Sequence, residues 1–176
     1  GRFERKFVIA DSTVKEVEAQ LMLHPALFRG IHEPRSVNNI YLDSLEFSHF
    51  FDNVEGNARR RKVRIRWYGS LEGTARSPKL EIKEKSGHIG WKQSFSIPDF
   101  DFDEQFDTKN LQAVIGSAEL PPALRQDLQT LRPALVNRYH RKYLLSWDRL
   151  FRVTLDDQLA YFGINNLASR FSFPKR

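Results

Sequence analysis

The 176-residue sequence has no cysteine and a single methionine. The absence of cysteine excludes disulfide bonds and thiolate metal sites, and it leaves the redox compartment open. No apolar run approaches the roughly 20 residues that a membrane-spanning helix needs, and no signal peptide is visible. We therefore expect a cytoplasmic domain, or one held at the cytoplasmic face of a membrane by segments that are not in this chain.

Two common ligand-binding signatures are missing as well. The sequence has no Gly-rich phosphate loop of the P-loop or dinucleotide-binding type, and the nearest glycines lie in turns. The histidines are scattered without metal-ligand spacing, so we interpret them as structural or surface residues. They are His24, His32, His49, His88 and His140.

The composition is that of a soluble globular protein, with 40% hydrophobic and 28% charged residues. The length suits one domain with its own core, so we expect a single domain over residues 1–176. The formal net charge of +6 favours an acidic partner, such as phosphate, nucleic acid or an anionic membrane.

Lysine and arginine alternate with apolar residues in several short, β-prone segments. The clearest examples are Lys62–Trp67, Lys79–Lys85 and Phe151–Asp156. Because successive side chains of a strand point to opposite faces, Arg64 and Arg66 share one face of the sheet and apolar residues occupy the other. Like charges facing each other on a sheet are destabilising. A solvated face explains any one such strand, but repetition across several strands favours a face that binds a polyanion.

Turn signals divide the rest of the chain into strands and helices. The predicted strands are Arg2–Ala10, Val37–Asp43, Arg59–Tyr68, Lys79–Lys85, Trp91–Ile97, Leu135–Ser146 and Phe151–Ala160. The predicted helices run from a cap at Asp11 or Ser12 to Pro25, and over Leu45–Val54, Leu111–Ile115 and Pro121–Leu131. A turn-rich stretch extends through Pro34, and the acidic stretch Asp99–Asp107 is expected to be a solvated loop or excursion. About seven strands with hairpin-length links predict a mostly antiparallel α+β domain, open or closed into a barrel. With the basic face inside, such a barrel is a positively charged tunnel.

A series of motifs along the chain resembles a known family. In order they are Glu4-Arg5-Lys6-Phe7, Tyr41-Leu42-Asp43, Arg64-Ile65-Arg66-Trp67-Tyr68-Gly69, Leu80-Glu81-Ile82-Lys83, Lys92, Arg132-Pro133, Tyr139-His140-Arg141 and Arg152-Val153-Thr154-Leu155-Asp156. With this order and spacing, the chain resembles the VTC domain, the polyphosphate-polymerase-like branch of the triphosphate tunnel metalloenzymes in the CYTH-like superfamily.

The resemblance implies an eight-stranded antiparallel tunnel with helices packed outside, which binds ATP and inorganic polyphosphate or triphosphate together with Mn²⁺ or Mg²⁺. It implies catalytic roles for the basic residues Lys6, Arg64, Arg66, Lys83, Arg141 and Arg152. Substrate-binding roles fall to Lys62, Lys85, Lys92 and Tyr139, the last as a hydrogen-bond donor. Two carboxylates, Glu4 and Glu81, are placed to orient the basic groups or to help hold metal.

Two departures from the family pattern bear on metal binding. The first-strand signature Glu-x-Glu-x-Lys reads Arg2-Phe3-Glu4-Arg5-Lys6 here, so arginine replaces one carboxylate. The family's last strand carries a Glu-x-Lys pair, and nothing after Tyr161 matches it. We therefore expect a domain that lacks its last strand or is truncated before it.

Three functional hypotheses follow. The first is a phosphotransferase that moves the γ-phosphate of ATP to polyphosphate. The second is a triphosphatase acting on inorganic, nucleotide or RNA 5′ triphosphate, and the third is a non-catalytic polyphosphate sensor or scaffold. The run Arg59-Arg60-Arg61-Lys62 resembles a nucleic-acid patch, but we interpret it as a solvated strand end and expect no specific nucleic-acid partner. The sequence indicates no oligomeric state.

Overall fold

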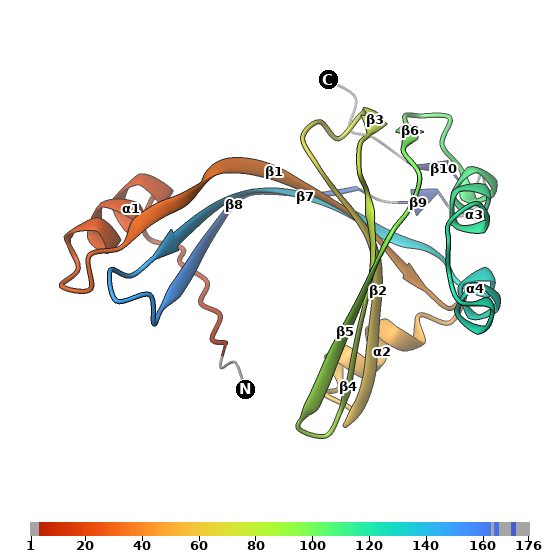
Figure 1. Cartoon of the computed structure of the whole chain (residues 1–176), viewed down its shortest axis with the longest axis horizontal. Coiled ribbons are helices and arrows are strands. Elements are labelled where there is room, and N and C mark those ends of the chain that lie inside the picture. Colours follow the sequence, from red (N-terminus) through yellow and green to blue (C-terminus); the bar gives the residue numbers. More distant parts are fainter. Residues whose placement is uncertain (1–3, 163, 166–169, 172–176) are drawn as a thin grey trace. The chain divides into compact units, whose positions relative to one another are not determined.

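The computed structural model describes residues 4–162, 164–165 and 170–171 (Figure 1). The chain divides into two compact units. The first comprises Gly1–Pro34 and Arg141–Asp157, and the second comprises Arg35–His140 and Gln158–Arg176.

The main sheet has six strands in the order β5-β4-β2-β1-β7-β8. These strands are β1 (Arg29–Asp43), β2 (Arg59–Tyr68), β4 (Lys79–Ser86), β5 (Ile89–Ser96), β7 (Arg132–Leu145) and β8 (Arg152–Phe162). The pairs β1–β2, β2–β4 and β4–β5 are antiparallel. The expected α+β, mostly antiparallel class is therefore confirmed. Across the described residues this sheet does not close into a barrel, so the eight-stranded tunnel stays a prediction.

The core of the second unit lies on the apolar face of β2 and β4. Val63, Ile65 and Trp67 are buried with Leu80 and Ile82, as their alternation predicts. Two helices, α3 (Thr108–Gly116) and α4 (Pro122–Gln129), lie next to each other in Figure 1 and add buried leucine and isoleucine side chains to the same core. The buried residues they contribute are Leu111, Ile115 and Leu128.

The segment Asp99–Asp107 is not the solvated loop that its acidic composition predicts. It contains β6 (Phe100–Phe102), which pairs with β3 (Gly73–Ala75) in a separate two-stranded sheet. Phe100 and Phe102 lie 5.7 and 5.3 Å from Trp67 between ring centroids. Because aspartate and phenylalanine alternate in β6, the strand period buries Phe100 and Phe102 while Asp101 stays exposed. The acidic composition of this segment therefore does not indicate that its phenylalanines belong to the core.

The first unit contains α1 (Val14–Leu23), whose capping box is formed by Thr13 and Glu16. The cap is thus Thr13 and not Asp11 or Ser12, although the helix itself is confirmed. The predicted strand Arg2–Ala10 is wrong for its described part, because residues 4–10 have no regular secondary structure. Arg2 and Phe3 lie outside the described residues. Alternation shows that a segment fits a strand, but it does not supply the neighbouring strand whose hydrogen bonds a sheet requires.

Other boundaries differ in smaller ways. The predicted turn-rich stretch through Pro34 belongs to β1 from Arg29 onward. In the main sheet β1 is hydrogen-bonded to its neighbour β7, which supplies partners for its backbone groups. The helix α2 is shorter than predicted and spans Ser48–Val54. After Tyr161, the short strands β9 (Ile164–Asn165) and β10 (Arg170–Phe171) pair with each other, and the remaining C-terminal positions lie outside the described residues. Within the described ranges, no helix combines the length and apolar character needed to cross a membrane.

Candidate functional site

One face of β1, β2, β4 and β5 in the second unit is polar and basic. The register pairs Tyr41 with Arg64, Arg64 with Glu81, and Glu81 with Ser94. Side chains directly opposite each other point to the same side of a sheet, so these residues form one rung across four strands. We call the surface built from such rungs the basic face; its cations are Arg60, Lys62, Arg64, Arg66, Lys79, Lys83, Lys85 and Lys92.

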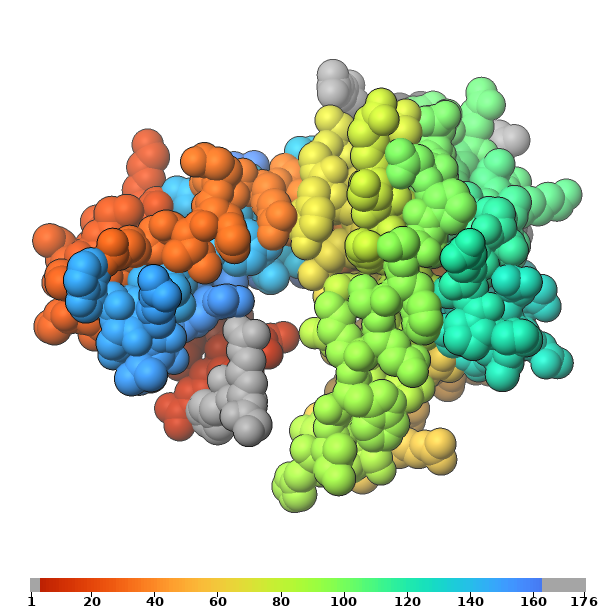
Figure 2. All heavy atoms as spheres, in the orientation of Figure 1, coloured from red at the N-terminus to blue at the C-terminus, as the bar shows by residue number. Residues whose placement is uncertain are grey.

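The next rung toward the β4–β5 turn consists of lysines alone. Lys62 lies opposite Lys83, and Lys83 lies opposite Lys92. In the space-filling view, β5 with its yellow-green residues forms an outer surface of this unit (Figure 2). The rung thus places three positive charges on neighbouring strands of one face, and Lys92 also donates to the carboxylate of Glu81.

Glu81 is the buried carboxylate at the centre of the basic face, with 6% of its surface exposed. Its Oε2 accepts hydrogen bonds from Arg64 Nε at 2.8 Å and Nη2 at 2.6 Å, and Arg66 Nη1 lies 3.8 Å away. Lys92 Nζ donates to the other carboxylate oxygen. One carboxylate thus gathers three cations that come from two different strands.

The charges around Glu81 determine its ionisation. Burial raises the pKa of Glu81, but the hydrogen bond from Lys92 and the charges of Arg64 and Arg66 outweigh burial and lower this pKa to about 2. Burial likewise lowers the pKa of Arg64, and the interactions with Tyr41 and Glu81 outweigh it and raise this pKa above its ordinary value. At neutral pH Glu81 is therefore a carboxylate, and Arg64 is a charged guanidinium.

Neutral side chains hold the second guanidinium in place. Arg66 Nε donates to Asn39 Oδ1 at 2.9 Å, and its Nη2 donates to the hydroxyl of Tyr139 at 3.0 Å. Asn39 is fully buried and donates in turn to Asn137 Oδ1 at 2.8 Å. Together with Glu81, these uncharged partners fix the orientation of Arg66.

The arrangement suits phosphate better than a metal ion. Arginine presents a planar fork to two phosphate oxygens, and lysine adds point charges along an extended anion. Glu81 by contrast is a poor ligand for a divalent cation, since three cations already surround it. Within the ranges that the structure describes, no cluster of three or more His, Cys, Asp or Glu side chains forms a metal site. The predicted metal role of Glu81 therefore does not fit its surroundings.

The structure places eight of the predicted site residues in the second unit and four in the first. The eight are Lys62, Arg64, Arg66, Glu81, Lys83, Lys85, Lys92 and Tyr139. The four in the first unit are Glu4, Lys6, Arg141 and Arg152. Among these, Arg141 donates to both carboxylate oxygens of Asp156, at 2.5 and 2.6 Å. A single surface shared by all twelve stays a prediction.

Sequence reasoning missed three residues of the basic face, Asn39, Tyr41 and Lys79, and also Asn137 of β7, which accepts a hydrogen bond from Asn39. Lys79 carried a usable signal, since it has the same strand period as Lys83. It lies opposite Arg66 and donates to Ser96 Oγ at 2.7 Å. Asn39 also carried one, because a polar residue inside the run Val37–Leu42 has to find a partner when it is buried.

Comparison with known proteins gives one finding. The model of the family described as the VTC domain matches residues 1–173. No sequence among the curated proteins matches the chain.

Proposed function

Because the chain belongs to the VTC domain family, we propose that its basic face holds a chain of phosphates and transfers the γ-phosphate of ATP to inorganic polyphosphate. The observation that carries the proposal is the gathering of Arg64, Arg66 and Lys92 around Glu81, next to the lysine rung. Phosphoryl transfer depends mainly on in-line positioning and on cations where negative charge develops. The basic face supplies both without a protein nucleophile.

In the proposed reaction, an oxygen of the terminal phosphate of the chain attacks the γ-phosphorus of ATP. The bond between that phosphorus and the oxygen bridging to the β-phosphate breaks, and ADP leaves. Arg64 and Arg66 are oriented by Glu81, Asn39 and Tyr139, so their N–H groups need little reorganisation to stabilise the transferred group. The lysine rung holds the growing chain.

Metal dependence is a separate part of the proposal. Mn²⁺ or Mg²⁺ commonly binds through substrate phosphates and one or two carboxylates. Such an ion would neutralise phosphate charge and come to the basic face with ATP, since the described carboxylates there form no cage of their own. Omission of Mn²⁺, or addition of a chelator, tests this part.

The assay incubates the purified chain with ATP, Mn²⁺ and a short polyphosphate primer, and it measures polymer length on gels together with released phosphate. Arg66→Ala and Lys83→Ala are expected to abolish polymer formation. Lys109→Ala removes an exposed positive charge from α3 and is the matched control, expected to keep full activity. Full activity of Arg66→Ala would contradict the proposal.

A non-catalytic polyphosphate-binding role is the second candidate. The observation that favours it is the position of Glu81, whose negative charge is used to hold cations and is not offered to a metal ion. Tight tripolyphosphate binding without consumption of ATP would select this role. Release of free phosphate without polymer would instead indicate a triphosphatase.

A further inference from the structure

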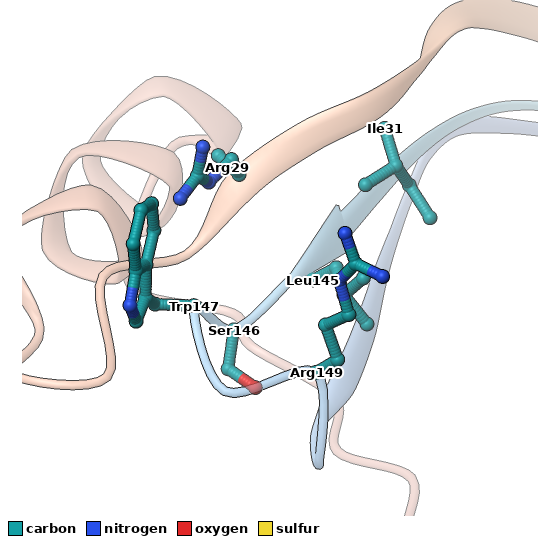
Figure 3. Close-up of a pocket in the computed structure, with 6 residues that line it drawn as sticks. All are labelled: Arg29, Ile31, Leu145, Ser146, Trp147 and Arg149. Carbon is teal, nitrogen blue, oxygen red and sulfur yellow. The ribbon is translucent and has the colours of Figure 1, made fainter.

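A separate concave site lies in the first unit, between the start of β1 and the turn that joins β7 to β8 (Figure 3). Its cavity volume is about 290 Å³. The residues that line it are Arg29, Ile31, Leu145, Ser146, Trp147 and Arg149. All belong to the first unit, so the site does not depend on the basic face.

The first arginine of the site is held against an aromatic ring. Arg29 Cζ lies 4.0 Å from the ring centroid of Trp147, and Figure 3 shows the guanidinium beside the indole. The Trp147 backbone N–H donates to the Ala26 carbonyl at 2.9 Å, which ties the turn to the segment before β1. Stacking uses the face of a guanidinium and leaves its in-plane N–H donors to bind an anion.

The second arginine, Arg149, sits in the turn with a φ of 62°, in the left-handed region. Figure 3 shows its side chain extending past Leu145 toward Ile31. The neighbouring carboxylate of Asp148 is used inside the turn, where it accepts from Ser146 Oγ at 2.5 Å and from Leu150 N at 3.0 Å. These hydrogen bonds, of which the one from Ser146 has the largest effect, lower the pKa of Asp148.

Within the described part of the chain, no carboxylate neutralises either arginine of the pocket. Among the described residues, neither Arg29 nor Arg149 forms an ion pair within 4.0 Å. Between them, Ile31 and Leu145 supply apolar, half-buried walls. Two unneutralised guanidinium groups beside an apolar cavity match the usual design of small-molecule sites, which are mostly apolar with a few placed polar groups.

We propose that this pocket binds a small anion with a flat apolar body, a phosphate or carboxylate group carried on a ring. The ring lies against Ile31, Leu145 and the exposed indole of Trp147, and the anionic group takes hydrogen bonds from Arg29 and Arg149. The cavity volume is at the lower end of the range for ligand pockets, which favours a ligand of one ring over a nucleoside triphosphate.

Titration of the full chain followed by indole N–H signals in ¹H–¹⁵N spectra tests the proposal. The signal of Trp147 is assigned with Trp147→Phe and separated from those of Trp67 and Trp91. Phenyl phosphate and benzoate are the probes, and phenol and inorganic phosphate supply the body and the anionic group alone. We expect a saturable shift of the Trp147 signal with at least one probe, and much weaker binding of phenol and inorganic phosphate. Tighter binding of phenyl phosphate assigns a phosphate ester, and tighter binding of benzoate assigns a carboxylate.

Arg149→Gln is expected to weaken probe binding about tenfold, as loss of one charge-assisted hydrogen bond does, and Arg149→Lys by less. A thermal melt of each variant verifies that it folds. Arg66→Ala in the basic face is expected to leave probe binding unchanged, so failure of the proposed phosphotransferase activity does not affect this test. Unchanged affinity in both Arg149 variants, or equal shifts of all three indole signals, would overturn the proposal.

Discussion

Replacing Glu81 by glutamine probes the centre of the basic face most directly. Glutamine keeps the size and one acceptor oxygen but removes the charge that holds Arg64, Arg66 and Lys92 together. Both arginine side chains are nearly buried, with 14% and 12% exposed, whereas Lys92 is 47% exposed and can turn toward water. The cost therefore comes mainly from two guanidinium groups left without their anion.

The magnitude follows from the pKa of Glu81. One pKa unit corresponds to about 1.4 kcal/mol, so lowering the pKa from its ordinary 4.5 to about 2 corresponds to about 3 kcal/mol of stability. Removing one partner of a buried ion pair costs about 3–5 kcal/mol, which agrees in size. Because the folded-state pKa is depressed, this stability is present above pH 4.5 and is lost as the pH falls toward 2.

Urea unfolding at pH 7 and at pH 3 measures the effect. We expect Glu81→Gln to be about 3 kcal/mol less stable than the parent at pH 7, with a smaller gap at pH 3, because the parent carboxylate is then partly protonated in the unfolded chain. Sodium tripolyphosphate at pH 7 should narrow the gap, since its oxygens replace the lost charge. Glu84→Gln, on the other face of the same strand and 33% exposed, is the matched control, expected to cost less than about 1 kcal/mol. A cost that does not change with pH, or one equal to that of the control, would refute the reasoning.

Two further predictions follow from the same unit. Lys79→Ala is expected to weaken tripolyphosphate binding about tenfold in calorimetry, since Lys79 lies on the basic face opposite Arg66. Lys79→Arg should restore binding. An unchanged affinity of the alanine variant would show that Lys79 does not belong to the site. Phe102→Ala is expected to lower the free energy of unfolding by about 3–5 kcal/mol in urea, because this fully buried ring packs on Trp67 and Phe106. Val54→Ala on exposed α2 is its control, with an expected change within about 0.5 kcal/mol, and equal costs for the two variants would contradict the assigned core.

Prediction from the sequence succeeded where the pattern was local and long. The strand Arg59–Tyr68 has the predicted bounds, because the alternation of basic and apolar residues over Lys62–Trp67 allows one strand phase only. It failed where composition and periodicity disagreed, as in Asp99–Asp107, whose aspartates indicated solvent while its phenylalanines entered the core. The segment Glu4–Ala10 failed for a different reason, since a lone segment cannot show whether a neighbouring strand is available.

The candidate site likewise has features that could be predicted from the sequence and features that could not. That Arg64 and Arg66 share a face could be read from the sequence, because side chains of a strand alternate by covalent geometry. Only the tertiary structure shows that Glu81 is buried among three cations. It also shows that Lys62, Lys83 and Lys92 lie opposite one another, and that Asn39 accepts a hydrogen bond from Arg66. These contacts depend on the register between strands far apart in the chain, which non-local packing determines. The sequence by itself determined which residues share a face of each strand, and the tertiary structure decided which of them lie together.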